Sequence, residues 1–98
     1  MRIVISRSAD ADLIAGYRFY KGSGAEVGDY FLDSLMADID SLALFAGFHR
    51  KSGGFYVALS RRFPFAIYYK IENEVVRVRR VLDCRRDPNW IAQALKRG

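Results

Sequence analysis

The sequence contains very little cysteine and histidine, which removes two classes of site. Cys84 is the only cysteine and cannot form an internal disulfide, and His49 is the only histidine, so no Cys/His metal site can be assembled. Only two prolines are present and 51% of the residues are hydrophobic, which is not the composition of a disordered chain. We therefore expect a folded protein without a metal ion or a cofactor.

Long hydrophobic runs are also missing. No run approaches the roughly 20 apolar residues that a membrane-spanning helix needs, so we expect no membrane partner and a cytoplasmic location. A chain of 98 residues is also short for more than one independent core. We expect a single domain over residues 1–98.

Acidic residues are scarce in the second half of the chain. Residues 1–48 carry four bases and seven acids, whereas residues 49–98 carry twelve bases and four acids, so net charges of −3 and +8 combine to +5. Concentrated positive charge favours a polyanionic or acidic partner. A solvated sheet face of a small basic protein would show the same composition.

The first half of the sequence has one short strand pattern and two helical patterns. Alternating hydrophobic residues predict a strand over 1–6, and Ser8 is placed to cap a helix that ends near Gly22. Ser23 and Glu26 form a capping-box pattern at the start of a second helix, with hydrophobic residues at helical spacing up to Leu42. The short connection between the helices predicts an antiparallel helical hairpin.

The hydrophobic period changes to two after a glycine-rich loop over 47–54. Strands are predicted at 55–60, 65–71 and 75–83, and Asp87 followed by Pro88 is typical of the start of a short last helix. The predicted fold class is therefore α+β, in the order strand, helix, helix, strand, strand, strand, short helix. We expect an antiparallel sheet with the helical hairpin packed on one face and the opposite face partly open.

Arg80 breaks the alternation of the last predicted strand. It falls on the same side as Val76, Val78 and Leu82. Either its stem lies on apolar surface while its charge reaches water, or a β-bulge redirects it. The sequence leaves both readings open.

No nucleophile with an adjacent base is recognisable in the sequence. His49 lies in the glycine-rich loop, Cys84 lies beside Arg85, and no glycine pattern matches a nucleotide-binding fingerprint. What remains is a set of arginines interleaved with aromatic residues. Such a set suits either stabilisation of charge on RNA phosphate or docking onto an acidic or DNA-bound protein.

Two stretches of the sequence carry a family resemblance. The string Arg-Phe-Pro-Phe-Ala-Ile-Tyr-Tyr at 62–69 is followed by Val-Leu-Asp-Cys-Arg-Arg-Asp-Pro at 81–88 and by Trp90. Together with the element order, these stretches resemble the ParE/RelE superfamily of type II toxin–antitoxin toxins, often called plasmid stabilisation proteins. The resemblance implies a bacterial growth inhibitor that is neutralised by a cognate antitoxin and that can dimerise when free of it.

The superfamily has two mechanistic branches. RelE-like members cut mRNA in the ribosomal A site, and ParE-like members inhibit DNA gyrase. Phe65 stands where RNA-cutting members commonly have a basic residue, and Asp83 stands where many relatives have histidine. These departures and the long helical hairpin favour a ParE-like gyrase inhibitor that is not an enzyme. The alternatives are a RelE-like ribosome-dependent endoribonuclease and a degenerate, non-catalytic binding module.

The ribonuclease reading and the gyrase-inhibitor reading assign function to different residues. If the protein is a ribonuclease, the resemblance and the charge pattern assign catalysis to Arg85, Arg62, Arg61 and Arg80. The predicted binding residues are Arg77, Arg79, Arg86, Tyr68, Tyr69 and Trp90. We expect the arginines of the second half to converge on one exposed surface, and Phe55, Val57 and Tyr69 to lie near the open face that an antitoxin covers.

Overall fold

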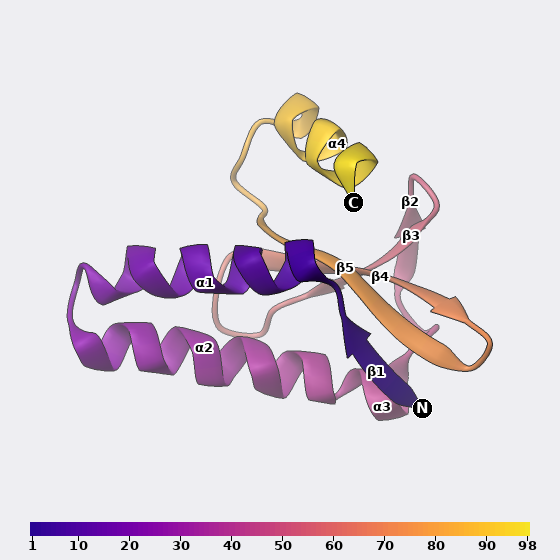
Figure 1. Ribbon diagram of the computed structural model, residues 1–98, viewed down its shortest axis with the longest axis horizontal. Coiled ribbons are helices and arrows are strands. Elements are labelled where there is room, and N and C mark those ends of the chain that lie inside the picture. Colours follow the sequence, from indigo (N-terminus) through magenta and orange to yellow (C-terminus); the bar gives the residue numbers. More distant parts are fainter.

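A computed structural model describes residues 1–98, and the chain forms nine elements (Figure 1). In chain order they are β1 (Arg2–Ile5), α1 (Arg7–Lys21), α2 (Ala25–Asp40), α3 (Leu42–Phe45), β2 (Arg50–Ser52), β3 (Phe55–Leu59), β4 (Phe65–Glu72), β5 (Val75–Asp83) and α4 (Pro88–Arg97). None of the helices has the length and hydropathy needed to cross a membrane.

The strands form one sheet in the order β1-β5-β4-β3-β2. The predicted α+β architecture is confirmed, with α1 and α2 packed side by side against one face (Figure 1). One pair differs from the expected antiparallel arrangement, because β1 runs parallel to β5. The helical hairpin, α3 and strands β2 to β4 lie between these two strands in the sequence, so the connection is long enough for a parallel pair.

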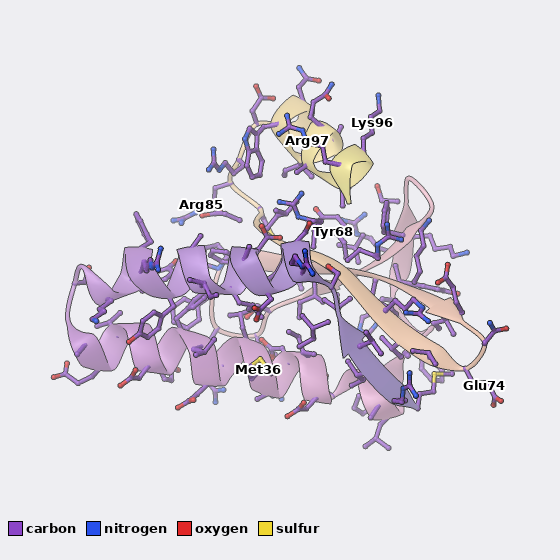
Figure 2. The ribbon with its side chains drawn as sticks, in the orientation of Figure 1. Met36, Tyr68, Glu74, Arg85, Lys96 and Arg97 are labelled. Carbon is purple, nitrogen blue, oxygen red and sulfur yellow. The ribbon has the colours of Figure 1, made fainter.

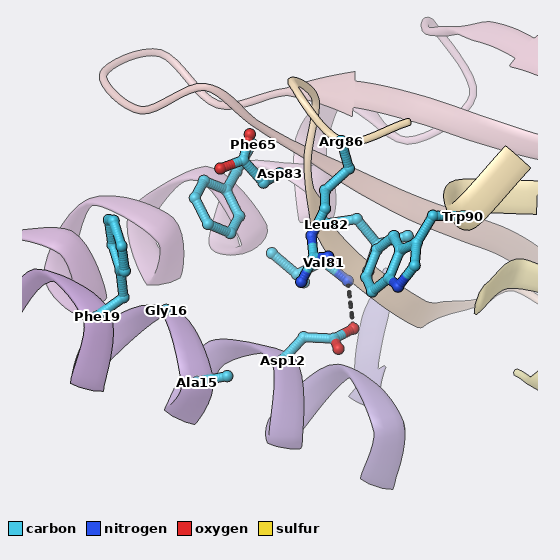
Figure 3. Close-up of a pocket in the computed structure, with 10 residues that line it drawn as sticks. All are labelled: Asp12, Ala15, Gly16, Phe19, Phe65, Val81, Leu82, Asp83, Arg86 and Trp90. Atoms are coloured by element: carbon cyan, nitrogen blue, oxygen red, sulfur yellow. Dashed lines mark hydrogen bonds between the residues drawn. The ribbon is translucent and has the colours of Figure 1, made fainter. Parts of the chain in front are cut away.

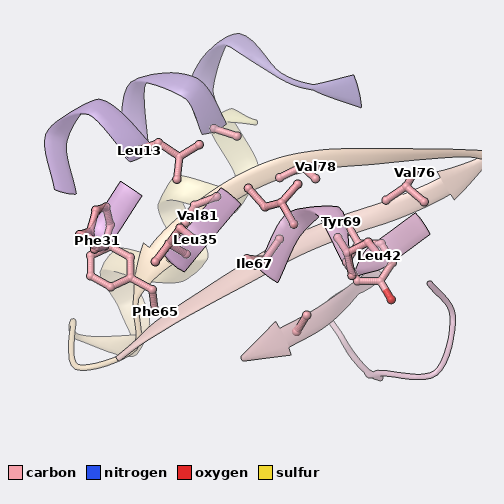
Figure 4. Packing of buried hydrophobic residues seen from close by; sticks show 13 residues of the cluster. Leu13, Phe31, Leu35, Leu42, Phe65, Ile67, Tyr69, Val76, Val78 and Val81 are labelled. Carbon is pink, nitrogen blue, oxygen red and sulfur yellow. The ribbon is translucent and has the colours of Figure 1, made fainter. Parts of the chain in front are cut away.

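The larger core lies between the sheet and the helical hairpin (Figure 4). Phe31 and Leu35 of α2 meet Ile67 and Tyr69 of β4 there, and Tyr69 has no exposed surface. The expectation that Tyr69 lies near an open face is therefore wrong. Alternate residues of β4 face the helices, and Tyr69 shares that side with Ile67.

A second, smaller core lies on the opposite face of the sheet. Phe55, Val57, Tyr68 and Leu82 are buried there together with Ala94 of α4. Figure 1 shows α4 on the side of the sheet away from the hairpin. The face that we expected to be partly open is thus partly covered by the chain's own last helix.

A β-bulge in β5 redirects Arg80. Tyr68 pairs with Arg80 but Tyr69 pairs with Val78, so Arg79 is the extra residue. Beyond the bulge Val81 faces the larger core and Leu82 the smaller one. The predicted grouping of Leu82 with Val76 and Val78 is wrong, and of the two readings of Arg80 the bulge is correct.

Both predicted caps of the hairpin helices are wrong. Ser6, not Ser8, caps α1 by accepting a hydrogen bond from the backbone N–H of Ala9 at 3.0 Å. The residue before α2 is Gly24, without a side-chain cap, at a φ of 136° that favours glycine. This sharp turn replaces the predicted Ser23–Glu26 capping box.

The glycine-rich loop contains an element that the sequence did not predict. Residues Arg50–Ser52 form β2 and pair antiparallel with β3. Three consecutive polar residues show no alternation of hydrophobicity, so only the pairing with β3 identifies this strand. At the end of the chain the prediction is confirmed, since the Asp87 side chain accepts from the N–H of Asn89 at 2.9 Å and begins α4.

Candidate functional site

The predicted site residues do not converge on one surface. Arg61 and Arg62 lie in the loop between β3 and β4, beside α2. Arg77 and Arg79 lie on β5 next to β1, and Arg86 lies at the base of α4. The expectation of a single arginine surface is wrong, because the loop between β3 and β4 places Arg61 and Arg62 beside α2, away from the α4 face that carries Arg77, Arg79 and Arg86.

A groove of about 510 Å³ runs between α4 and the hairpin of β2 and β3. Phe55, Tyr68 and Ile91 supply apolar surface, and Arg86 and Lys96 supply positive charge. Figure 2 shows Tyr68 on the sheet below α4 and Lys96 at the end of that helix. Desolvation is the main cause that raises the pKa of Tyr68, so its hydroxyl stays neutral at physiological pH.

Cys84 lines the same groove and is exposed. The pKa of its thiol is raised, first by desolvation and then by the charge of Asp83. The neighbouring arginines do not reverse this shift. Since the thiolate is the reactive form, Cys84 is a poor nucleophile here.

Arg86 and Trp90 form a cation–π pair at the start of α4, with the guanidinium carbon 3.9 Å from the ring centroid. Both residues also line a second hollow of about 360 Å³ between α1 and α4 (Figure 3). Phe19 and Phe65 complete its apolar lining. Arg86 therefore stands between the two hollows that flank α4.

Arg80 is held by a nearly buried ion pair. Its Nε and Nη2 donate to the two carboxylate oxygens of Asp12 at 2.8 and 2.9 Å, and both side chains are only 13–14% exposed. Nη1 donates to the carbonyl of Ala94 in α4 at 2.7 Å. The hydrogen bond to Asp12 is the main cause that raises the pKa of Arg80. Arg80 thus connects α1, β5 and α4.

Arg85 is paired with Asp83 in the same bidentate manner. Its Nε and Nη2 donate to Asp83 at 3.0 and 2.7 Å, and its backbone N–H donates to the same carboxylate at 2.8 Å. Hydrogen bonding from Arg85 is the main cause that lowers the pKa of Asp83. Unlike Arg80, Arg85 remains largely exposed (Figure 2).

His49 joins Arg61 and Arg62 in a third hollow of about 240 Å³. Its Nδ1 lies 2.6 Å from the hydroxyl of Tyr69, which also accepts a hydrogen bond from the backbone N–H of Gly47 at 2.9 Å. Asp38 fixes the arginine loop by accepting from the hydroxyl of Ser60 and, at 3.3 Å, from the backbone N–H of Arg61. This hollow brings together one imidazole and two guanidinium groups, and neither Arg80 nor Arg85 lines it.

The family match decides the identity of the chain. Residues 3–88 match the family described as the ParE toxin of the type II toxin–antitoxin system parDE. The chain belongs to the ParE toxin family.

A solved structure titled "Chromosomal ParDE TA system from P. aeruginosa" resembles this ParE-family chain, with a TM-score of 0.75 and 21% sequence identity. The alignment covers 83% of this chain and 92% of the other. At this identity the likeness supports the fold. No curated protein matches the sequence.

In this ParE-family chain, α4 lies almost entirely beyond the residues that match the family. The groove between α4 and the hairpin of β2 and β3 therefore combines strands inside the family match with a helix outside it.

Sequence reasoning also missed Arg50 and Lys70 as site residues. Arg50 pairs with Val57 and Lys70 with Arg77, which places both on the face that carries α4. The pairing register of β2 would have identified Arg50 as a residue of the α4 face, but β2 itself was not predicted.

Proposed function

We propose that this protein inhibits bacterial growth by binding DNA gyrase, and that a cognate antitoxin neutralises it. Membership of the ParE toxin family supports the toxin role. The observation that favours gyrase binding over RNA cleavage is the pairing of two candidate catalytic arginines with carboxylates. Arg80 is bound by Asp12 with both side chains nearly buried, so its guanidinium is not free to hold a phosphate, and Arg85 is paired with Asp83 although it stays largely exposed.

The target would contact the face that carries α4. Arg86 and Trp90 at the base of α4, with Arg79 on β5, offer a planar cation, an aromatic ring and further positive charge. Tryptophan and arginine are the residue types that contribute most often to protein interfaces. This surface suits a large acidic or DNA-bound partner.

Supercoiling and translation assays on the same purified protein test this proposal. We expect the protein to inhibit gyrase supercoiling and to leave translation intact. The variant Arg86→Gln/Trp90→Ala should need at least tenfold more protein for the same inhibition, and Arg18→Gln on the exposed side of α1 is the charge-matched control. Unchanged supercoiling with arrested translation and cut mRNA would refute gyrase as the target.

An mRNA interferase is the second candidate function, and the third hollow favours it. His49 could transfer a proton while Arg61 and Arg62 hold the phosphate, since all three line that hollow. In that case His49→Gln and Arg62→Ala should each abolish ribosome-dependent cleavage. If expression without the antitoxin leaves growth unchanged, both candidates fail and a degenerate binding module remains.

The antitoxin is tested separately by co-expression with the adjacent reading frame. The expected result is co-purification of a small acidic chain and restoration of growth. A toxin that purifies alone and stays toxic under co-expression would contradict this part of the proposal.

A further inference from the structure

The groove between α4 and the hairpin of β2 and β3 has an apolar floor. Ala94 is the buried residue of α4, and it packs into the smaller core of the sheet. Ile91 and Leu95 are partly buried against the same core and also line the groove, together with Phe55 and Tyr68. A volume of about 510 Å³ with this lining lies in the range of sites that bind small molecules.

The charges that line the groove have one sign. Arg86 precedes α4 and Lys96 lies in its last turn (Figure 2), no carboxylate lines the groove, and neither cation forms an ion pair. Arg50 on β2 and Lys70 on β4 add positive charge on the same face of the sheet. Unpaired cations beside apolar surface favour a ligand that supplies the negative charge itself.

Arg86 is the cation best placed to hold a carboxylate. Its guanidinium stacks on the ring of Trp90, with 3.9 Å between the guanidinium carbon and the ring centroid. Stacking uses the flat face of the guanidinium and leaves the N–H groups at its edge accessible to a carboxylate. Arg86 therefore offers the groove a cation that the aromatic ring holds in place.

The aromatic rings in the groove give a nucleobase no surface for stacking. Phe55 and Tyr68 are each only 8% exposed, and their rings meet edge to face. The ammonium group of Lys70 lies over the ring of Phe55, 4.8 Å from its centroid. Bases stack on open aromatic faces, whereas this groove offers ring edges and the aliphatic side chains of Ile91 and Leu95. The lining therefore fits an alkyl chain better than a base.

We propose that this groove binds a medium-chain fatty acid, with the alkyl chain along Ile91 and Leu95 and the carboxylate on Arg86. The inference goes beyond the proposed function, because it concerns a small ligand and neither the target nor the antitoxin. A bilayer surface fits less well, because Phe55 and Tyr68 lie at the bottom of a recess and do not protrude.

The experiment uses decanoate as the probe and the single cysteine as the reporter. Cys84 is exposed and lines the groove, so a bound ligand should shield its thiol from N-ethylmaleimide. We expect saturating decanoate to slow this alkylation, followed by mass spectrometry, at least tenfold. Octanoate should bind at least fivefold more weakly, since each buried methylene strengthens binding. Decyltrimethylammonium has the same chain with the opposite charge and should leave the alkylation rate within twofold.

Two pairs of variants locate the ligand by isothermal titration calorimetry. Arg86→Gln should weaken decanoate binding at least tenfold, whereas Arg97→Gln removes a charge from α4 outside the groove and should stay within twofold. Ala92→Phe fills the groove from an exposed helical position and should abolish binding. Gln93→Phe, at the next position of α4, does not face the groove and should retain it. Circular dichroism verifies that all four variants are folded.

Several results would overturn the inference. Equal shielding by decanoate and decyltrimethylammonium would indicate unspecific adsorption of the chain, and unchanged affinity in both Arg86→Gln and Ala92→Phe would place the ligand elsewhere. Shielding of Cys84 by a short single-stranded DNA but not by decanoate would assign the groove to nucleic acid. Gyrase inhibition is measured without fatty acid, so its failure would refute the proposed target and leave this site unaffected.

Discussion

At the scale of single residues, Asp12 on α1 connects the first helix with the end of β5, far away in the sequence. It binds Arg80 through both oxygens and also accepts a hydrogen bond from the backbone N–H of Val81 at 3.0 Å. This backbone bond is formed just beyond the β-bulge. Asp12 thus stabilises the guanidinium of Arg80, which contacts α4. It also stabilises the strand geometry after the bulge, which directs Arg80 inward.

We predict that Asp12→Asn destabilises the protein by about 3 kcal/mol, because the variant leaves the guanidinium of Arg80 nearly buried without a counter-charge. Urea unfolding followed by circular dichroism measures the loss. Asp33→Asn, on the exposed face of α2, is the control and should change stability by less than about 0.5 kcal/mol. Equal effects of the two substitutions would show that the ion pair contributes nothing.

A pH dependence is expected from Asp83, whose folded pKa is lowered mainly by the hydrogen bond from Arg85. A lowered folded pKa contributes stability above the unfolded value of about 3.9, and this contribution is lost as the pH falls through the folded value. The stability gap between wild type and Asp83→Asn should therefore narrow between pH 5 and about pH 2.5. Urea midpoints across this range measure the gap, with Asp33→Asn as control, and a constant gap would contradict the assignment.

At the scale of elements, the helical hairpin depends on a close approach at Gly16. A Cβ atom at this position would lie 2.4 Å from the ring of Phe31, which is fully buried. Helix α1 can therefore approach α2 this closely only where it lacks a side chain. The sequence showed a glycine inside a helical pattern without showing this reason for it.

Gly16→Ala sets two effects against each other. Alanine favours the helix by about 1 kcal/mol, but overpacking against a buried ring costs about 1–3 kcal/mol. The steric effect should dominate, so we predict a net loss of about 1 kcal/mol in unfolding free energy. In the background Phe31→Leu, which removes the ring, the same substitution should be neutral or stabilising. Equal effects in both backgrounds would exclude the contact as the cause.

At the scale of the whole molecule, positive charge lies mainly on the sheet face that carries α4. Arg50, Lys70 and Arg79 are on that face, and the hairpin on the other side carries most of the acids of the first half. This separation gives the molecule an orientation in the field of a charged partner.

We predict that gyrase association slows about tenfold between 50 and 500 mM salt, because screening shortens the range of the attraction. Stopped-flow fluorescence measures this rate. Replacing Arg50, Lys70 and Arg79 by glutamine should reduce the salt dependence. The same change at Arg7, Arg18 and Lys21 on α1 keeps the net charge equal and should affect it less. Identical behaviour of the two triple variants would mean that only net charge matters.

The fold was largely predictable because its elements are amphipathic and follow regular periods. Helices α1, α2 and α4 and four of the five strands follow from such patterns, and the family resemblance rests on residues 62–69 and 81–88. The site was less predictable, because it depends on offsets of a single residue. The bulge at Arg79 decides which side of the sheet Arg80 takes, and β2 decides where Arg50 lies. Neither the bulge nor β2 produces a periodic pattern in the sequence.

The parallel pairing of β1 with β5 has a consequence for synthesis of the chain. Arg2 pairs with Val75, 73 positions later, and the backbone N–H of Ser6 donates to Val78. Contacts this distant in sequence form late, since the ribosome makes the first partner long before the second. The first strand leaves the ribosomal tunnel before its neighbour exists. A nascent chain therefore cannot complete its sheet until β5 has left the ribosome.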